Sequence, residues 1–207
     1  MRLNRRKRMK KGLKVLIVLA VIVALFIGGI FGFKAYSDYR SKKSLQETRE
    51  RTRDALAQFE YTVPEGFEDK ATGESYEYQW WIYREGAVTC AIDFFSWERE
   101  TGRSLLDEFT DDYKSDEGKE YKIISPLEDI DIDGIPGRRV TTEQREVSEE
   151  WGVHFVTRET IYYLETEDYL LRITYGISDD NMFEGDDGLT EKCFADQKAF
   201  FDSLKKK

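Results

Sequence analysis

The residues able to perform nucleophilic or metal chemistry are few in this 207-residue chain. His154 is the single histidine, so a zinc site with two histidines is excluded. Cys90 or Cys193 could pair with His154 as a thiol nucleophile, but both lie on apolar faces of their predicted elements, where a thiolate is disfavoured. The sequence contains neither a Gly-x-Ser-x-Gly elbow nor a phosphate-binding glycine loop. We therefore expect no enzymatic activity, no metal and no cofactor.

Two groups of acidic residues resemble loops that bind divalent cations. Asp129, Asp131 and Asp133 alternate before Gly134, as in an EF-hand loop, but Val140 stands where that loop needs a bidentate glutamate. We predict an edge strand here, with its acids in water and a turn at Asp133-Gly134; weak calcium binding is the alternative. The second group, within residues 179–187, is predicted to be a solvated loop before a helix.

The two cysteines occupy apolar positions in different predicted elements. Cys90 shares one face of a predicted strand with Val88, Ile92 and Phe94, and Cys193 lies on the apolar side of a predicted C-terminal helix. Small buried hydrophobic side chains of this kind favour free thiols. A disulfide between them is the alternative, and it requires that the helix cover that strand.

Aromatic residues give the best indication of a binding surface. They alternate along residues 76–83 and recur at positions 94–97, so the predicted strands carry aromatic side chains on both faces. A sheet covered on both faces would bury them in its core. An open face would instead present a platform for a glycan or a partner protein, with Trp81, Tyr83 and Trp97 as the candidate binding residues.

The N-terminus has the pattern of a membrane anchor. Eight basic residues lie within residues 1–14, ahead of the uncharged apolar stretch 15–33, whose 19 residues span about 28 Å as a helix. Lys and Arg are retained in the cytoplasm, which predicts a basic cytoplasmic tail, a single transmembrane helix and everything after about Tyr36 outside. A cleaved signal peptide with its site at Ala35-Tyr36-Ser37 is the alternative, but its apolar core would be unusually long.

The charge of the chain is divided unequally. Residues 1–35 contain nine basic and no acidic residues, while residues 36–207 contain 23 basic and 41 acidic ones, a net charge of −18. An acidic domain of this kind repels nucleic acid, so nucleic acid is excluded as a partner. The basic tail suits anionic lipids at the cytoplasmic surface.

Residues 34–60 are charged, free of Gly and Pro, and rich in helix formers, which predicts a solvated helical stalk. Residues 61–207 are predicted to form one α+β domain, a mainly antiparallel sheet with packed helices. Its predicted strands are residues 61–63, 76–83, 87–95, 122–125, 129–132, 137–144, 153–165 and 169–177, with helices from Ser104 and over 193–204.

The order of several segments resembles a known superfamily. Residues 61–67 (YTVPEGF) open the domain, residues 131–140 (DIDGIPGRRV) lie in its middle, and a hairpin over 161–175 precedes the closing helix 194–204. In this order they resemble the PsbP/Mog1-like superfamily over residues 61–205. The resemblance implies an αβα sandwich of the kind found in many bacterial membrane-anchored proteins. It also implies an accessory or scaffold role with no shared active site, so it assigns no functional residue.

We therefore expect a non-catalytic accessory or interaction module held at the plasma membrane by one span, with its C-terminal domain outside the cell. A long anchor without a lipid-attachment cysteine favours a Gram-positive cell envelope. The expected partner is an envelope or membrane protein. The alternative is a module that binds envelope glycan or peptide through the aromatic patch.

Overall fold

The computed structural model describes residues 34, 36–70, 79–86, 88–100, 102–148, 153–179 and 189–207. The chain divides into two compact units, Met1–Leu45 and Gln46–Lys207. The predicted cytoplasmic tail 1–14 and transmembrane span 15–33 lie outside the described residues. Within the described ranges, no helix is long and apolar enough to cross a membrane.

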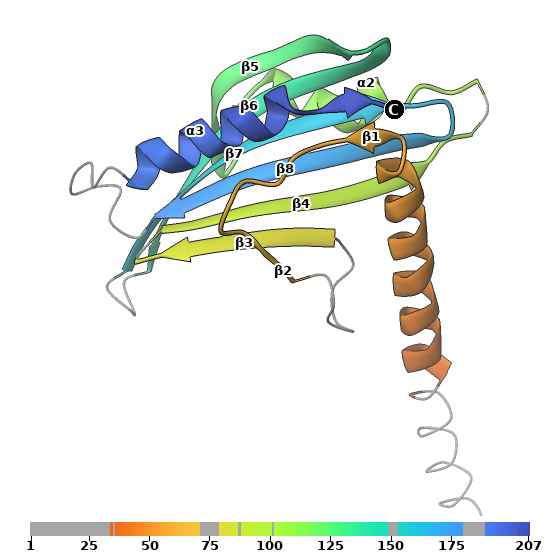
Figure 1. The fold of residues 1–207 in the computed structure, drawn as a ribbon, viewed down its shortest axis with the longest axis horizontal. Helices are drawn as coiled ribbons and strands as arrows, with labels where there is room; N and C mark the ends of the chain where they lie inside the picture. Colours follow the sequence, from red (N-terminus) through yellow and green to blue (C-terminus); the bar gives the residue numbers. More distant parts are fainter. Residues whose placement is uncertain are drawn as a thin grey trace, which may run out of the picture. The chain divides into compact units, whose positions relative to one another are not determined.

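The second unit is built on a seven-stranded sheet in the order β2-β3-β4-β8-β7-β6-β5, in which all neighbouring strands are antiparallel (Figure 1). Its strands are β2 (Glu68–Asp69), β3 (Gln79–Glu85), β4 (Val88–Glu98), β5 (Tyr121–Ile132), β6 (Ile135–Ser148), β7 (Val153–Glu165) and β8 (Tyr169–Asp179). β1 (Phe59–Glu60) and β9 (Lys205–Lys206) form a separate two-stranded pair. The predicted α+β class with a mainly antiparallel sheet is confirmed.

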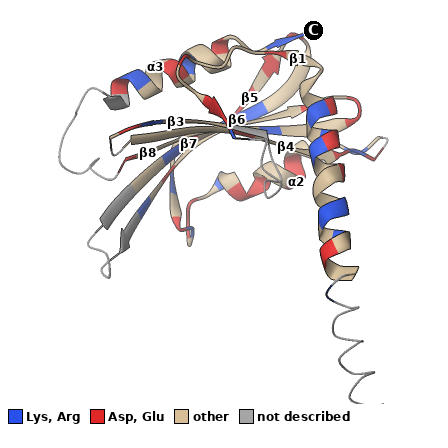
Figure 2. Cartoon of the chain, turned by 60° about the horizontal axis from the view of Figure 1, so that its bottom comes forward, with Lys and Arg blue, Asp and Glu red and all other residues tan. Residues whose placement is uncertain are grey.

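The helices of the second unit lie on opposite faces of this sheet. α3 (Leu189–Asp202) lies on one face, and the short helix α2 (Leu106–Thr110) with the 3₁₀ turn η1 (Asp111–Lys114) lies on the other (Figure 2). We call these the α3 face and the α2 face. Because side chains alternate along a strand, each strand supplies both faces, and the two faces have separate cores.

The core of the α3 face follows from strict alternation in β4 and β8. Val88, Cys90, Ile92 and Phe94 are fully buried on β4, opposite Ile173, Tyr175 and Ile177 of β8. α3 covers them with Cys193, Phe200 and Phe201, and Leu204 follows just beyond the helix. On the α2 face, Leu105 and Leu106 instead pack on Val140, Ile161, Tyr163 and Leu170.

A disulfide joins Cys90 of β4 to Cys193 of α3, with their Cα atoms 6.7 Å apart. The expectation of free thiols was therefore wrong, and the alternative holds. Both cysteines are almost fully buried, because α3 lies directly across the strand that carries Cys90. With both sulfurs in the bridge, neither can act as the thiol partner of His154.

The predicted stalk ends inside the compact unit. Residues 36–56 are helical, as predicted, but the unit begins at Gln46. Thr52, Ala55 and Leu56 are buried, Phe59 follows in the same core, and the Thr52 hydroxyl lies 3.2 Å from that of Ser96. The thin apolar stripe of this helix is therefore a packing surface, and a boundary at residue 61 lies too far along the chain.

Tertiary context changes two of three local predictions and leaves the third, a turn, as expected. Residues 122–125 and 129–132 belong to one strand, β5, which passes Pro126 with shifts in register, as an edge strand can. The predicted turn at Asp133-Gly134 is confirmed: both residues have positive φ, as a two-residue hairpin turn requires. Ser104 does not cap the helix that follows; its hydroxyl donates to Glu165 instead.

Residue 137 of β6 must be a glycine, because the backbone of β7 lies too close for a side chain at this position. A Cβ atom at this position would clash with the Tyr163 carbonyl oxygen and the Leu164 side chain. We expect Gly137→Ala to lower the free energy of unfolding by about 1–3 kcal/mol, the usual cost of overpacking. Gly176→Ala is the matched control, since its Cβ would lie 3.7 Å from the nearest Glu159 atom. Equal melting temperatures for the two variants would contradict this assignment.

The Cys90–Cys193 bridge closes a loop with a sequence separation of 103 residues. Removing it restores conformational freedom to the unfolded chain, so we expect the double variant Cys90→Ala/Cys193→Ala to lose about 2–5 kcal/mol of unfolding free energy. Urea titration of the full-length protein in detergent measures this loss. An unchanged unfolding midpoint would show that the bridge does not stabilise the fold.

Candidate functional site

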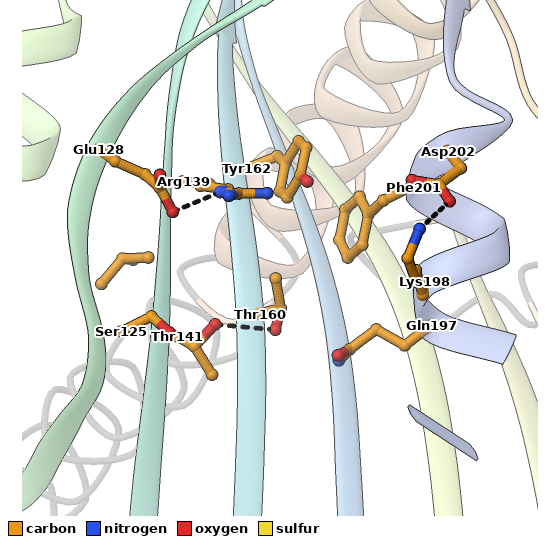
Figure 3. A pocket seen from close by; sticks show the side chains of 11 residues that line it. Ser125, Glu128, Arg139, Thr141, Thr160, Tyr162, Gln197, Lys198, Phe201 and Asp202 are labelled. Carbon is orange, nitrogen blue, oxygen red and sulfur yellow. Dashed lines mark hydrogen bonds and ion pairs between the residues drawn. The ribbon is translucent and has the colours of Figure 1, made fainter. Parts of the chain in front are cut away.

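A groove lies on the α3 face, between α3 and the strands β5, β6 and β7. It encloses about 310 Å³, at the lower end of the range for small-ligand sites. Ser125, Glu128, Arg139, Thr141, Thr160, Tyr162, Gln197, Lys198, Phe201 and Asp202 line it (Figure 3). β5 and β6 form one wall, β7 the floor and α3 the other wall.

Each of the two walls of the groove carries one ion pair. Arg139 Nε donates to Glu128 Oε1 at 2.5 Å, and this hydrogen bond lowers the pKa of the Glu128 carboxyl. Hydrogen bonds to Glu128 and Tyr162 raise the pKa of Arg139 in turn. On α3, Lys198 pairs with Asp202, one helical turn later. The groove therefore presents two cations and two anions while carrying little net charge.

The floor of the groove combines an aromatic stack with hydroxyl groups. The rings of Tyr162 and Phe201 are stacked with their centroids 3.9 Å apart and their planes at 12°. The hydroxyls of Thr141 and Thr160 lie 3.1 Å apart. Gln197 is less available, because its amide donates to the Tyr175 carbonyl oxygen at 3.1 Å. These groups can bind a polar ligand by hydrogen bonds and ring contact.

The lining residues do not contain a histidine or a cysteine, and the two carboxylates are each paired with a cation. Among the described residues, no group of three histidine, cysteine, aspartate or glutamate side chains could hold a metal ion. The groove as described offers recognition groups, with no nucleophile next to a general base.

The three aromatic residues predicted to bind a ligand do not form one surface. Trp81 and Tyr83 pair with Ile92 and Cys90 and so lie on the α3 face, whereas Trp97 pairs with Leu170 on the α2 face. All three are half-buried. A platform shared by all three is therefore not possible in this fold.

Each of these rings has neighbours of its own. Tyr83 stacks on Phe67 at 5.7 Å between centroids, with the Lys192 ammonium 4.2 Å from its ring centre. The Nε1 of Trp81 is buried with no hydrogen-bond partner among the described residues. Trp97 packs against Phe109 at 4.3 Å and Phe95 at 4.6 Å.

Sequence reasoning missed the groove because its residues are assembled by strand register and by the position of α3. One signal was present: Arg138-Arg139 follows Glu128-Asp129 across a predicted turn, which is the pattern of cross-strand ion pairs. Nothing in the spacing placed residues 197–202 opposite them.

The sequence matches no protein-family model and no curated protein. Among solved structures, the fold is similar to that of LpqN, a protein involved in cell envelope biogenesis of Mycobacterium tuberculosis. The TM-score is 0.48 at 8% sequence identity, over 71% of this chain and 82% of LpqN. Similarity at this level does not transfer an activity, a ligand or a partner.

The two kinds of groove residue should respond differently to substitution. Glu128 and Arg139 are each 46% exposed, so we expect Glu128→Gln to leave the melting temperature close to that of the wild type. Phe201 is 7% exposed, and Phe201→Ala should cost about 3–5 kcal/mol. Thermal unfolding of both variants checks this. A large loss of stability in Glu128→Gln would show that the ion pair is structural instead of available to a ligand.

Proposed function

We propose that this protein is a membrane-anchored module that acts outside the cytoplasm and binds another envelope or membrane protein through the groove on the α3 face, without catalysis. The groove carries the proposal: it offers paired charges, hydroxyls and a ring stack, which suit recognition of a polar protein segment. The anchor predicted for residues 15–33 would hold the domain at the membrane surface.

The Cys90–Cys193 disulfide supports the extracytoplasmic location. Disulfides form and persist in oxidising compartments and are rare in the cytosol. This bridge joins two elements that are far apart in the sequence and is buried beneath α3. A location outside the cytoplasm also agrees with the basic residues of the tail, which are retained on the cytoplasmic side.

Helices on both faces of an antiparallel sheet also support the finer assignment to the PsbP/Mog1-like superfamily and its αβα sandwich. We infer this assignment from the order of the elements. Accessory and scaffold roles are common in that superfamily, and they agree with a groove that has no histidine or cysteine among its lining residues.

Site-specific photocrosslinking in the native membrane tests the proposal. A photoreactive residue replaces Lys198 on the groove wall in the full-length protein, and crosslinked proteins are identified by mass spectrometry. Lys114 is the matched control: it is also an exposed lysine paired with an aspartate on the same helix, but it lies on η1, on the α2 face. We expect a reproducible protein partner from position 198 that is absent from position 114. The same set of crosslinks from both positions, or none from position 198, would overturn the proposal.

A further inference from the structure

The α2 face carries a second group of polar side chains, Asp93 on β4, Arg172 on β8 and Glu159 on β7. We call it the Asp93–Arg172–Glu159 cluster. Strand register places all three side chains on this face, on three adjacent strands. It lies beside the part of the sheet on which Leu105 and Leu106 pack. Solvent reaches it, since the side chains of Asp93 and Arg172 are 26% and 30% exposed.

Small residues lie between the charged ones. Gly176 of β8 is opposite both Ala91 of β4 and Glu159 of β7. The Glu159 side chain lies over this glycine, because a Cβ atom on Gly176 would be 3.8 Å from Glu159 Oε1. The two carboxylates and the guanidinium therefore surround the short side chains of Thr174 and Ala91 and the bare backbone of Gly176.

The aromatic neighbours hold Arg172 in place. Its guanidinium lies 5.7 Å from the ring centre of Phe95 and 5.8 Å from that of Trp97, and Trp97 is itself packed against Phe109. Contacts of this kind restrict a long side chain that would otherwise be mobile. Trp97 was predicted to contact a ligand directly; in this arrangement it positions the arginine.

The hydrogen-bonding capacity of the cluster is largely unused. Arg172 and Asp93 are 3.8 Å apart at their closest, too far for a hydrogen bond, and Arg172 Nε is buried without a partner. Neither carboxylate accepts a hydrogen bond from a described residue. A guanidinium only donates and a carboxylate only accepts, so a ligand that satisfies all three must do both.

Asp93 is held here at a cost to stability. Burial raises the pKa of Asp93, Arg172 lowers it and the nearby Glu159 charge raises it, which together leave it at about 6. Burial also raises the pKa of Glu159. At neutral pH Asp93 is ionised with weak compensation, and features that lower stability in this way are typical of functional sites.

The charges of the Asp93–Arg172–Glu159 cluster determine which class of ligand it can bind. A simple cation would leave the buried Arg172 Nε without an acceptor, and a simple anion would be repelled by the two carboxylates and by the net charge of −18 on residues 36–207. Neighbouring hydroxyls of a neutral sugar ring can donate to the carboxylates and accept from the guanidinium at the same time. We propose that the Asp93–Arg172–Glu159 cluster binds a neutral saccharide, with Asp93 and Glu159 accepting hydrogen bonds from ring hydroxyls and Arg172 donating to them. This site is separate from the groove and does not depend on it.

Saturation-transfer NMR on the full-length protein in lipid nanodiscs tests the proposal, with empty nanodiscs as the background. The probes are chitotriose, cellotriose and maltotriose, with glycylglycine as a zwitterionic comparison. We expect at least one trisaccharide to bind at pH 7.5, with at least tenfold weaker binding for Asp93→Asn and Arg172→Gln. The matched control is Arg158→Gln, a strand arginine on the α3 face, outside the groove lining and with the same 30% exposure as Arg172, which should bind like the wild type.

The proposal is overturned if no trisaccharide binds, if glycylglycine alone binds, or if Asp93→Asn and Arg172→Gln bind as well as the wild type.

A loss of binding that results from misfolding is distinguished by thermal unfolding. The folded pKa of Asp93 lies above its ordinary value of 3.8, so its ionised form destabilises the fold above about pH 6, and this penalty is lost as the pH falls toward 4. Asp93→Asn should therefore melt at a higher temperature than the wild type at pH 7.5, and this gain should shrink toward pH 4. A variant that is more stable yet binds less has lost the ligand contact and not the fold.

Discussion

The packing of α3 across β4 and β8 is the interaction on which most of this structure depends. The Cys90–Cys193 bridge fastens the first half of the helix to the sheet, and Phe200, Phe201 and Leu204 bury its second half. The chain then forms β9, which pairs with β1, so this strand pair also holds the C-terminal end of α3. Because one wall of the groove is α3 itself, the groove exists only while this packing holds.

The same strands give the two faces of the sheet different chemistry. On β4, the residues that face α3 are apolar and fully buried, while Asp93, Phe95 and Trp97 alternate with them on the α2 face. β7 and β8 repeat this division, with Tyr162 and Tyr175 on one face and Glu159 and Arg172 on the other. A single sheet can therefore carry the groove on one face and a separate polar cluster on the other.

Much of the fold could be predicted from local sequence. Alternation located β4, β7 and β8, and the spacing of Cys193, Phe200 and Leu204 located the closing helix. The boundary of the domain was misplaced because the stripe at Thr52, Leu56 and Phe59 is too thin to distinguish a packed helix from a solvated one. The disulfide was underrated for a related reason: whether two buried cysteines meet depends on which element covers which strand, and sequence spacing does not give that.

The two candidate sites were harder to predict than the fold. Arg139 meets Tyr162 only through the register of β6 and β7, and Phe201 reaches them only through the position of α3. Likewise, Asp93 and Arg172 are distant in the sequence and become neighbours through the pairing of β4 with β8. The aromatic pattern did indicate Trp97, but only the structure shows that its ring holds an arginine.

The most direct test is the oxidation state of Cys90 and Cys193 in protein taken directly from its native membrane. It reports whether α3 is covalently attached to the sheet and whether the domain lies outside the cytoplasm. Cells are quenched in acid, and thiols are alkylated under denaturing conditions before and after reduction. We expect no alkylation before reduction and two alkylated cysteines after it. Two free thiols before reduction would contradict both the covalent attachment of α3 and the extracytoplasmic location of the domain.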